Sequence, residues 1–372
     1  MKILQGNALD VLRKMPDESV QCCVTSPPYF GLRDYKTEPS VWGGEPDCAH
    51  EWGKSERPHH PGQVEQTKWK SADAAGKGGN AIAGKFCQKC NAWLGSFGLE
   101  PTPDLYVEHA VTIFRETRRV LRKDGIFWLN IGDSYASGKG TCYNPGGGDT
   151  SLGKDRKAEG AHPLDRGNKS TLAAVGLKPK DLVGIPWMLA FALRADGWYL
   201  RSDIIWQKPN VMPSSVQDRR TMAHEYLFML TKSARYYFDA EAIKEPSTNA
   251  GQIVSLGEQS FSKRQADGAG VKPSGNGNAD EYTVKETRNK RSVWTVATSP
   301  YKEAHFATFP PKLIEPCILA GSKSGDVVLD PFAGSGTTGA VALRHGRDFI
   351  GIELNPDYIA LIHKRLLAEI LK

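Results

Sequence analysis

Short apolar runs alternate along this chain with longer segments whose apolar residues recur every three or four positions. The short runs predict buried strands at residues 20–25, 126–131, 199–206, 225–231, 326–330 and 348–353. The periodic segments predict helices at residues 104–122, 182–195, 337–345 and 356–371. This alternation favours a mostly parallel, twisted α/β sheet that is flanked by helices on both faces.

Three polar stretches interrupt this pattern, at residues 41–95, 136–180 and 244–293. They contain much Gly, Pro, Ser, Asn and charge, and few large aliphatic residues, which is typical of surface insertions and long loops. We therefore expect one α/β domain spanning residues 1–372 and enlarged by three insertions, of which residues 136–180 form a flexible loop.

The composition narrows the class of protein. Hydrophobic residues make up 40% of the chain, which is enough for a sizeable core and excludes wholesale disorder. No apolar stretch approaches the roughly 18 residues needed to cross a bilayer, and the N-terminus lacks a signal-peptide pattern. We therefore expect a cytoplasmic protein with no membrane partner. The formal net charge of +6 suits a phosphate-rich partner without identifying one.

A glycine-rich turn joins the predicted strand 326–330 to the predicted helix 337–345. Glycines let the backbone approach a ligand, and the helix N-terminus offers N–H groups to an anion. Glu353, at the end of the next strand, could accept hydrogen bonds from a ribose. A triphosphate is disfavoured because no Lys precedes Thr337, whereas a dinucleotide and S-adenosylmethionine both remain open. A dinucleotide suits the G-x-G-x-x-G spacing of Gly334, Gly336 and Gly339.

A second turn, Ser26-Pro27-Pro28-Tyr29, follows the apolar strand 20–25. Prolines remove N–H donors, so the carbonyl groups around them act as acceptors, while Tyr29 offers a ring for stacking. The Ser26 hydroxyl and the Pro27 carbonyl could therefore accept both N–H groups of an exocyclic amine on a nucleobase. Such a pair favours a more nucleophilic nitrogen and stabilises the charge that develops on it during methyl transfer. The alternative is a tight structural turn.

Together, the two turns resemble the motifs of the amino-group DNA methyltransferases of the permuted β class. Ser26-Pro27-Pro28-Tyr29 is similar to the catalytic motif of that family, and residues 330–338 are similar to its cofactor motif. In this chain the catalytic motif comes first, as it does in the β class. The resemblance implies a Rossmann-like methyltransferase fold with circularly permuted motif order, in the cytoplasm of a bacterial host and encoded by the bacterium or by a phage.

The same resemblance implies S-adenosylmethionine as cofactor, double-stranded DNA as substrate and a flipped target base. It assigns catalysis to Ser26, Pro27, Pro28 and Tyr29. It assigns cofactor binding to Asn7, Thr25, Phe309, Asp330, Phe332, Gly334, Ser335, Gly336, Thr337, Thr338 and Glu353. Family members commonly carry an acidic residue where this chain has Asn7, which can still hydrogen-bond to an adenine edge. Serine at position 26 favours cytosine N4 over adenine N6 as the methylated atom, and N6-adenine methylation is the alternative.

A separate cluster of metal-ligating residues lies in the first insertion. Cys48 and His50 precede a polar stretch, and Cys87 and Cys90 follow it. The Cys-x-His and Cys-x-x-Cys motifs supply four ligands between them, which is enough for a tetrahedral Zn²⁺ site. We therefore expect a structural zinc ion that staples a coreless insertion. His59 and His60 are alternative ligands, and two unrelated surface clusters are the other explanation.

By position in the family, residues 244–293 correspond to the target-recognition region. Arg288-Asn289-Lys290-Arg291 could contact phosphate or guanine, and the basic residues of 139–180 could close over DNA. Two other classes compete with a methyltransferase: a nicotinamide-dependent oxidoreductase and a non-catalytic zinc protein that binds DNA. The sequence identifies neither the recognised DNA site, nor a restriction partner, nor an oligomeric state.

Overall fold

The structure is a computed structural model that describes residues 1–31, 37–53, 85–136, 142–143, 176–255, 281–299 and 309–371. The chain forms two compact units. The larger comprises Met1–Tyr237 and Ser292–Lys372, and the smaller comprises Phe238–Arg291. Across the described ranges, no helix combines the length and the apolar character needed to cross a membrane.

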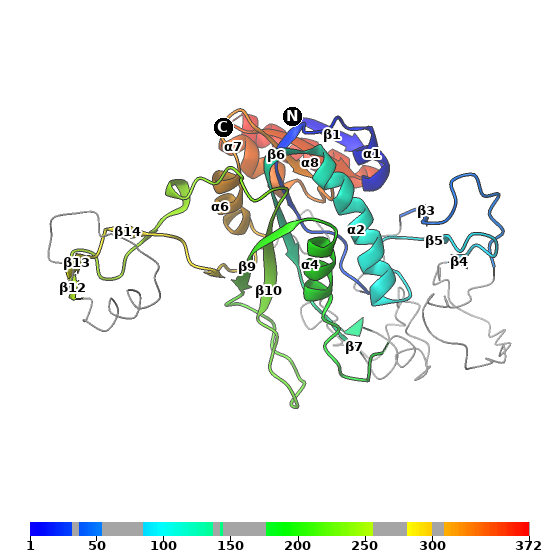
Figure 1. Ribbon diagram of the computed structural model, residues 1–372, viewed down its shortest axis with the longest axis horizontal. Coiled ribbons are helices and arrows are strands. Elements are labelled where there is room, and N and C mark those ends of the chain that lie inside the picture. Colours follow the sequence, from blue (N-terminus) through cyan, green and yellow to red (C-terminus); the bar gives the residue numbers. More distant parts are fainter. Residues whose placement is uncertain are drawn as a thin grey trace, which may run out of the picture. The chain divides into compact units, whose positions relative to one another are not determined.

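An eight-stranded sheet forms the centre of the larger unit, with the strand order β1-β17-β16-β2-β6-β10-β9-β15 (Figure 1). Its strands are β1 (Lys2–Gln5), β2 (Val20–Thr25), β6 (Leu121–Ile131), β9 (Tyr199–Gln207), β10 (His224–Thr231), β15 (Val293–Thr295), β16 (Val327–Asp330) and β17 (Asp348–Glu353). Neighbouring strands are parallel except at β10, which runs antiparallel to both β6 and β9. The predicted mostly parallel α/β sheet is therefore confirmed.

Two groups of helices cover this sheet. In the first group α1 packs against α2 and α2 against α4, and in the second α6 packs against α7 and α7 against α8. Their bounds are α1 (Ala8–Lys14), α2 (Pro103–Val120), α4 (Ile185–Ala195), α6 (Pro311–Gly321), α7 (Thr337–Arg344) and α8 (Pro356–Ile370). Every residue of the central strand β2 is buried, as expected for a strand covered on both faces.

Several elements differ from the predicted pattern. Strand β6 begins at Leu121, five residues before the predicted start, because the chain passes directly from α2 into the strand and Gly125 lies within it. Helix α6 escaped prediction because Pro311 opens it and Pro316 lies inside it, and proline normally signals a helix end. The short strands β1 and β15 also carry too few residues for a clear pattern.

The strand order brings distant parts of the chain together. Strand β16, near the C-terminus, lies between β17 and the N-terminal strand β2, and β1 pairs with β17. In Figure 1 the blue N-terminal elements accordingly lie beside the orange and red C-terminal ones. This arrangement places the two motif-bearing strands, β2 and β16, side by side.

A small antiparallel sheet with the order β3-β5-β4 is formed by the described parts of the first insertion. Its strands are β3 (Ser40–Trp42), β4 (Lys85–Phe86) and β5 (Trp93–Gly95). The expectation of a coreless insertion is wrong for these flanks, because Trp42 and Trp93 are 4% and 1% exposed and belong to the main hydrophobic core. The insertion contains few aliphatic residues, and these two tryptophans supply its apolar surface instead.

The second insertion lies mostly outside the described residues, which include only the pair β7 (Tyr135–Ala136) and β8 (Cys142–Tyr143) and the segment from Gly176 onward. Within its described residues, the smaller unit forms two short pairs of antiparallel strands. Its elements are the 3₁₀-helix η2 (Glu241–Ile243), β11 (Glu245–Pro246) paired with β14 (Thr287–Arg288), and β12 (Ile253–Ser255) paired with β13 (Glu281–Thr283). Val293, the last residue of the predicted recognition region, instead opens β15 of the central sheet.

Candidate functional site

The carboxyl ends of adjacent parallel strands bring the predicted site residues to one edge of the sheet. Strand β2 ends at Thr25, β16 at Asp330 and β17 at Glu353, while Asn7 follows β1. In open α/β sheets, this edge is where ligands bind.

The turn after β16 is shaped by two glycines with left-handed backbone. Gly334 and Gly336 have φ of +52° and +77°, and helix α7 begins directly after Gly336. The Gly334 N–H donates to Glu353 Oε2 at 2.8 Å, and the Asn355 N–H donates to Oε1 at 2.9 Å. Burial raises the pKa of Glu353, while these N–H groups oppose the rise. Each carboxylate oxygen has a second lone pair, so Glu353 can still accept hydroxyl groups.

Beneath this turn, Asp330 forms a buried network with two threonines. Its carboxylate accepts hydrogen bonds from Thr25 Oγ1 at 2.5 Å, Thr338 Oγ1 at 2.7 Å and the Phe332 N–H at 3.0 Å. Burial raises the pKa of Asp330 to about 6 although these donors act to lower it. The network joins β2 to β16 and to the first turn of α7.

The side chains of Ser335 and Thr337 point at Arg365 of α8. Arg365 Nη1 donates to both hydroxyl oxygens at 2.9 Å and to the Ser335 carbonyl at 3.1 Å. Both residues are nearly fully buried. Arg365 therefore fixes the middle of the glycine-rich turn from below, a contact that the sequence motifs do not reveal.

Two further predicted cofactor residues lie on other elements. Asn7 caps helix α1, because its Oδ1 accepts the Leu9 N–H at 2.9 Å, and its Nδ2 donates to Ser40 Oγ at 3.0 Å. Phe309 is buried and directly precedes Pro310, the N-cap of α6.

The turn after β2 holds its four predicted residues at the sheet edge. Pro27 is buried, whereas Ser26, Pro28 and Tyr29 are partly exposed. The Pro28 carbonyl accepts from Tyr106 Oη at 2.9 Å. Within the described residues, no hydrogen bond reaches the Pro27 carbonyl, so the acceptor beside Ser26 stays available.

A polar network that sequence reasoning missed holds the Tyr29 hydroxyl. Tyr29 Oη donates to Glu225 Oε2 at 2.8 Å and accepts from Ser26 Oγ at 3.2 Å. Asn130 Nδ2 donates to the same Glu225 oxygen at 3.3 Å, and Lys208 pairs with the other. Burial raises the pKa of Tyr29, and the Glu225 charge adds to the rise, so the phenol stays protonated as a donor.

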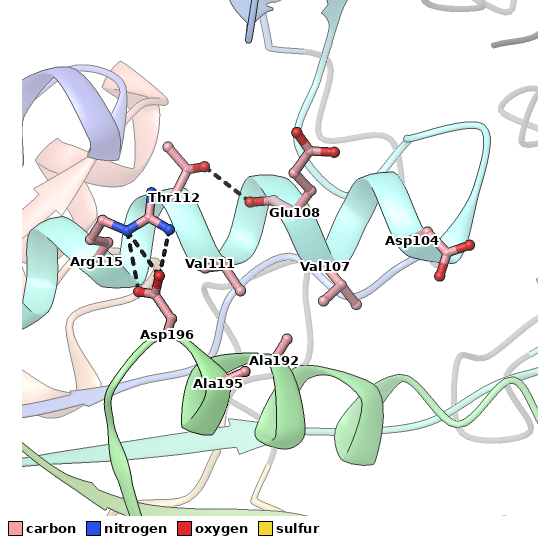
Figure 2. A pocket seen from close by; sticks show the side chains of 9 residues that line it. All are labelled: Asp104, Val107, Glu108, Val111, Thr112, Arg115, Ala192, Ala195 and Asp196. Atoms are coloured by element: carbon pink, nitrogen blue, oxygen red, sulfur yellow. Dashed lines mark hydrogen bonds and ion pairs between the residues drawn. The ribbon is translucent and has the colours of Figure 1, made fainter. Parts of the chain in front are cut away.

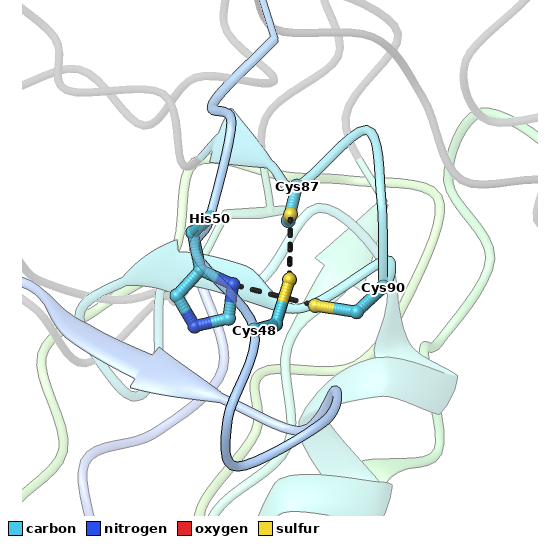
Figure 3. A group of neighbouring side chains, drawn as sticks. All are labelled: Cys48, His50, Cys87 and Cys90. Carbon is cyan, nitrogen blue, oxygen red and sulfur yellow. Dashed lines mark hydrogen bonds between the residues drawn. The ribbon is translucent and has the colours of Figure 1, made fainter.

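The four predicted metal ligands come together in the first insertion (Figure 3). All four ligand atoms lie within 4.8 Å of one another. Cys48 Sγ lies 3.9 Å from Cys87 Sγ, and Cys90 Sγ lies 3.3 Å from His50 Nδ1. The alternative ligands at positions 59 and 60 lie outside the described residues.

A groove of about 530 Å³ runs between α2 and α4, where Val107, Val111 and Ala192 form much of its lining (Figure 2). Arg115 and Asp196 form an ion pair across it. The groove shares no residue with the sheet edge described above, where the motif residues gather, so the candidate site lies elsewhere.

In the smaller unit, two of the basic residues singled out for DNA contact are engaged in ion pairs. Arg288 Nε and Arg291 Nε both approach Glu245 Oε1, at 2.9 and 2.5 Å. Burial acts to raise the pKa of Glu245, but the two guanidinium groups outweigh it and the pKa is lowered. These arginines therefore close the hairpin β11–β14.

The sheet, the glycine-rich turn over Glu353 and the Ser-Pro-Pro-Tyr turn on the adjacent strand define a Rossmann-like methyltransferase with permuted motif order. Residues 20–364 match the DNA methylase family of N6 and N4 methyltransferases, and the chain belongs to this family. It is thus an S-adenosylmethionine-dependent DNA amino-methyltransferase.

Curated relatives align over nearly the whole chain. The type II methyltransferase M.Cfr9I of Citrobacter freundii is 39% identical over 99% of this chain and 88% of its own length. M.XycI of Xanthomonas campestris pv. cyanopsidis is 40% identical with the same coverage, and M.SmaI of Serratia marcescens is 37% identical over 98% of this chain and 90% of its own. These matches leave the oxidoreductase interpretation unsupported.

Among solved structures, the PvuII DNA methyltransferase, titled cytosine-N4-specific, aligns with a TM-score of 0.51. The match has 17% sequence identity and covers 98% of this chain and 85% of that one. At this identity the match shows a shared fold.

Proposed function

We propose that this enzyme transfers a methyl group to the N4 amino group of a cytosine that is flipped out of double-stranded DNA. The observation that carries this proposal is the Ser26–Tyr29 turn, which lies at the end of β2 beside the glycine-rich turn of β16. A base buried in the duplex cannot reach this edge, so the proposal includes extrusion of the target base.

The cofactor site is proposed at the carboxyl ends of β16, β17 and β1. S-adenosylmethionine supplies an electrophilic methyl group on a sulfonium centre. Glu353 fits its ribose hydroxyls, and the N-terminus of α7 after Gly336 fits its carboxylate. Gly334 allows close approach, because a side chain added there would meet only the Phe332 carbonyl, at 3.8 Å.

The proposed cofactor residues divide into two groups. Phe332, Gly334, Gly336 and Glu353, with Asn7 and Phe309, form the walls of the site. Thr25, Asp330, Ser335, Thr337 and Thr338 are buried and bonded to one another or to Arg365, so we assign them to holding the turn in shape.

At the catalytic turn, Ser26 Oγ and the Pro27 carbonyl accept the two N–H groups of the target amine. These bonds favour a pyramidal nitrogen whose lone pair is available, and they stabilise the positive charge that develops there. Pro28 fixes the backbone, and the Tyr29 ring provides a stacking surface for the base. Glu225 accepts the proton of the Tyr29 hydroxyl and is itself held by Asn130 Nδ2, and this pair orients the ring.

The methylated atom is tested by digesting modified DNA to nucleosides and analysing them by mass spectrometry. The substrate is DNA from a host that lacks methyltransferases of its own. We expect N4-methylcytosine, because serine occupies position 26. N6-methyladenine as the sole product would overturn the cytosine assignment and leave the amino-methyltransferase activity intact.

We also propose a target-recognition role for the predicted region 244–293, of which residues 244–291 belong to the smaller unit. Its test is an exchange of residues 238–291 for the aligned segment of a relative with a different target. The methylated sequence should change with the exchanged segment, and an unchanged target would refute the assignment. We expect the enzyme to act in a type II restriction-modification system, as the names of its relatives indicate for those proteins.

A further inference from the structure

We propose that Cys48, His50, Cys87 and Cys90 bind a structural Zn²⁺, and that this ion secures one wall of the cofactor and target-base sites. The position of that wall depends on the site assignments proposed above. The metal site itself stands on the geometry of its four ligands.

The ligand geometry fits zinc. A tetrahedral Zn²⁺ with Zn–S of about 2.3 Å and Zn–N of about 2.0 Å separates its ligand atoms by roughly 3.5–3.8 Å. The separations of 3.9 Å between Cys48 Sγ and Cys87 Sγ and 3.3 Å between Cys90 Sγ and His50 Nδ1 bracket this range, and all four ligand atoms lie within 4.8 Å of one another. Four protein ligands leave no open position, which is the pattern of a structural site.

The surroundings of the cluster also suit a bound metal. The Lys89 N–H donates to Cys87 Sγ at 3.4 Å, and a bond of this kind orients a thiolate toward a metal. Gly44 has left-handed backbone, and a side chain there would come within 2.8 Å of Cys90 Sγ. The backbone therefore closes tightly around the sulfur atoms.

The cluster joins two segments that are separated by residues 54–84. The two segments also share backbone bonds, from Gly53 N–H to the Phe86 carbonyl at 3.0 Å and from Gln88 N–H to the Glu51 carbonyl at 2.9 Å. Closing a loop of this length costs conformational entropy, which the binding energy of a metal can offset.

The sheet that the cluster closes is anchored to α2. Trp42 and Trp93 stack against His109, with ring centroids 4.8 and 5.5 Å apart. His109 in turn bonds through Nδ1 to the fully buried Glu100 at 3.0 Å. The two tryptophans thus fix β3 and β5 on a helix of the main domain.

From this anchor, the segment after β5 reaches the cofactor turn. Phe97 stacks on Phe332, with centroids 5.8 Å apart and an interplanar angle of 21°. On the other side of the small sheet, Ser40 accepts the hydrogen bond from Asn7 described above. Two of the proposed cofactor-wall residues therefore contact the small sheet or its continuation.

The same segment supports the catalytic turn. The Gly98 carbonyl accepts the Gly31 N–H at 2.9 Å, and a side chain at Gly98 would lie 3.0 Å from Pro28 Cβ. Tyr106, which holds the Pro28 carbonyl, stacks on Phe97 with centroids 5.1 Å apart. Loss of the ion would thus loosen contacts to both turns at once.

The metal is tested first by elemental analysis of the purified full-length protein. We expect one zinc per chain in the wild type and in Cys317→Ser, a matched control at a buried cysteine of α6 outside the cluster. Cys90→Ser and His50→Ala should lose zinc, whereas His60→Ala should retain it. Equal zinc content in wild type and Cys90→Ser would refute the site, as would a Cys48–Cys87 disulfide in the native protein.

Cobalt substitution provides a readout that does not depend on activity. Co²⁺ in the wild-type protein should give the intense visible bands of tetrahedral coordination together with sulfur-to-metal charge transfer. An octahedral spectrum without thiolate bands would refute the ligand set. If a cysteine variant does not fold, the same comparison is made with the wild-type protein, from which zinc is removed by a chelator and to which it is then added back.

The wall role is tested by calorimetric binding of S-adenosylmethionine. Zinc removal should raise the Kd at least tenfold, and added zinc should restore it. Phe97→Leu should keep its zinc yet bind the cofactor more weakly. If zinc removal leaves both the Kd for S-adenosylmethionine and the rate of methyl transfer unchanged, the wall role is refuted. If the protein holds one zinc per chain but methylates no DNA, the result counts against the proposed function and leaves the zinc site intact.

Discussion

The two turns that form the candidate site are held in different ways. The cofactor turn after β16 is fixed largely from within its own motif, because Asp330 bonds to Thr338 and to the Phe332 N–H, while Thr25, Glu353 and Arg365 add bonds from other elements. The catalytic turn after β2 is fixed mainly from outside, and the residues that hold it are Tyr106, Asn130, Glu225 and Lys208.

This difference follows from what each turn has to do. A cofactor turn is preorganised when its polar side chains are buried and bonded, as those of Asp330, Ser335, Thr337 and Thr338 are. A catalytic turn must leave its acceptors at Ser26 and Pro27 available for the substrate amine, so neighbouring elements have to hold it. Substitutions at the two turns should therefore separate catalysis from stability.

The largest effect is expected at Ser26. Ser26→Ala removes one of two acceptors for the amine and should lower kcat by roughly 100- to 1,000-fold, the usual cost of losing one preorganised hydrogen bond in a transition state. The Kd for S-adenosylmethionine should be unchanged. Labelled methyl transfer and calorimetry measure the two quantities, and Ser19→Ala, at an exposed hydroxyl before β2, serves as control. A fully active Ser26→Ala enzyme would remove Ser26 from the mechanism.

At the cofactor turn, the expected effect is on the pH dependence of stability. The pKa of Asp330 is raised from 3.8 to about 6 in the folded protein, so the folded state binds the proton more tightly than the unfolded state. Its contribution to the free energy of unfolding is fully present below pH 4 and is lost as the pH rises through 6, by about 3 kcal/mol in total. In Asp330→Asn this loss should be absent.

Urea unfolding of both proteins between pH 4 and pH 7 measures the difference. Asp348→Asn, at a side chain that is 65% exposed, is the matched control and should retain the wild-type pH dependence. Identical slopes for the wild type and Asp330→Asn would contradict the raised pKa.

A smaller effect is expected at Glu225, outside the catalytic motif. Glu225→Gln keeps the shape of the side chain but removes the charge that holds Tyr29 and Lys208, and this should lower kcat about tenfold. Because Glu225 does not reach the cofactor turn, the Kd for S-adenosylmethionine should stay constant. Glu315→Gln, at an ion pair on α6, should leave kcat unaltered. A change in the Kd for S-adenosylmethionine without a change in kcat would show that Glu225 supports the cofactor turn and not the catalytic turn.

The smallest effect is expected at Ser40, an external contact of the cofactor side. Ser40→Ala removes the acceptor for Asn7 Nδ2 and should raise the Kd for S-adenosylmethionine two- to fivefold, the equivalent of one neutral hydrogen bond. Ser96→Ala, on the same small sheet's continuation, is the control because its hydroxyl bonds instead to the Thr37 carbonyl. If Ser40→Ala and Ser96→Ala raise this Kd equally, the cause is a general loss of order in the segment, and the specific role of the Ser40–Asn7 bond is contradicted.

The sequence predicts the backbone of both turns better than the distant side chains that hold them, for a local reason. Gly334 and Gly336 permit the left-handed backbone of the cofactor turn, and the prolines of the catalytic turn fix φ, so both backbones can be anticipated from residue type. The antiparallel β10 brings Glu225 to the sheet edge from nearly 200 residues away, and no local pattern signals that pairing. Arg365 is equally invisible, because on α8 it looks like an ordinary helix-surface cation.

The central position of β16 in the sheet has a consequence for how the protein is made. Because β16 lies between β2 and β17, and β1 pairs with β17, β1 has no partner and β2 has only β6 as a partner until residues 327–353 have been synthesised. Contacts of such sequence separation form slowly. The glycine-rich half of the site edge therefore forms late, and the buried strand β2 keeps one edge unpaired until β16 arrives, which exposes it to aggregation.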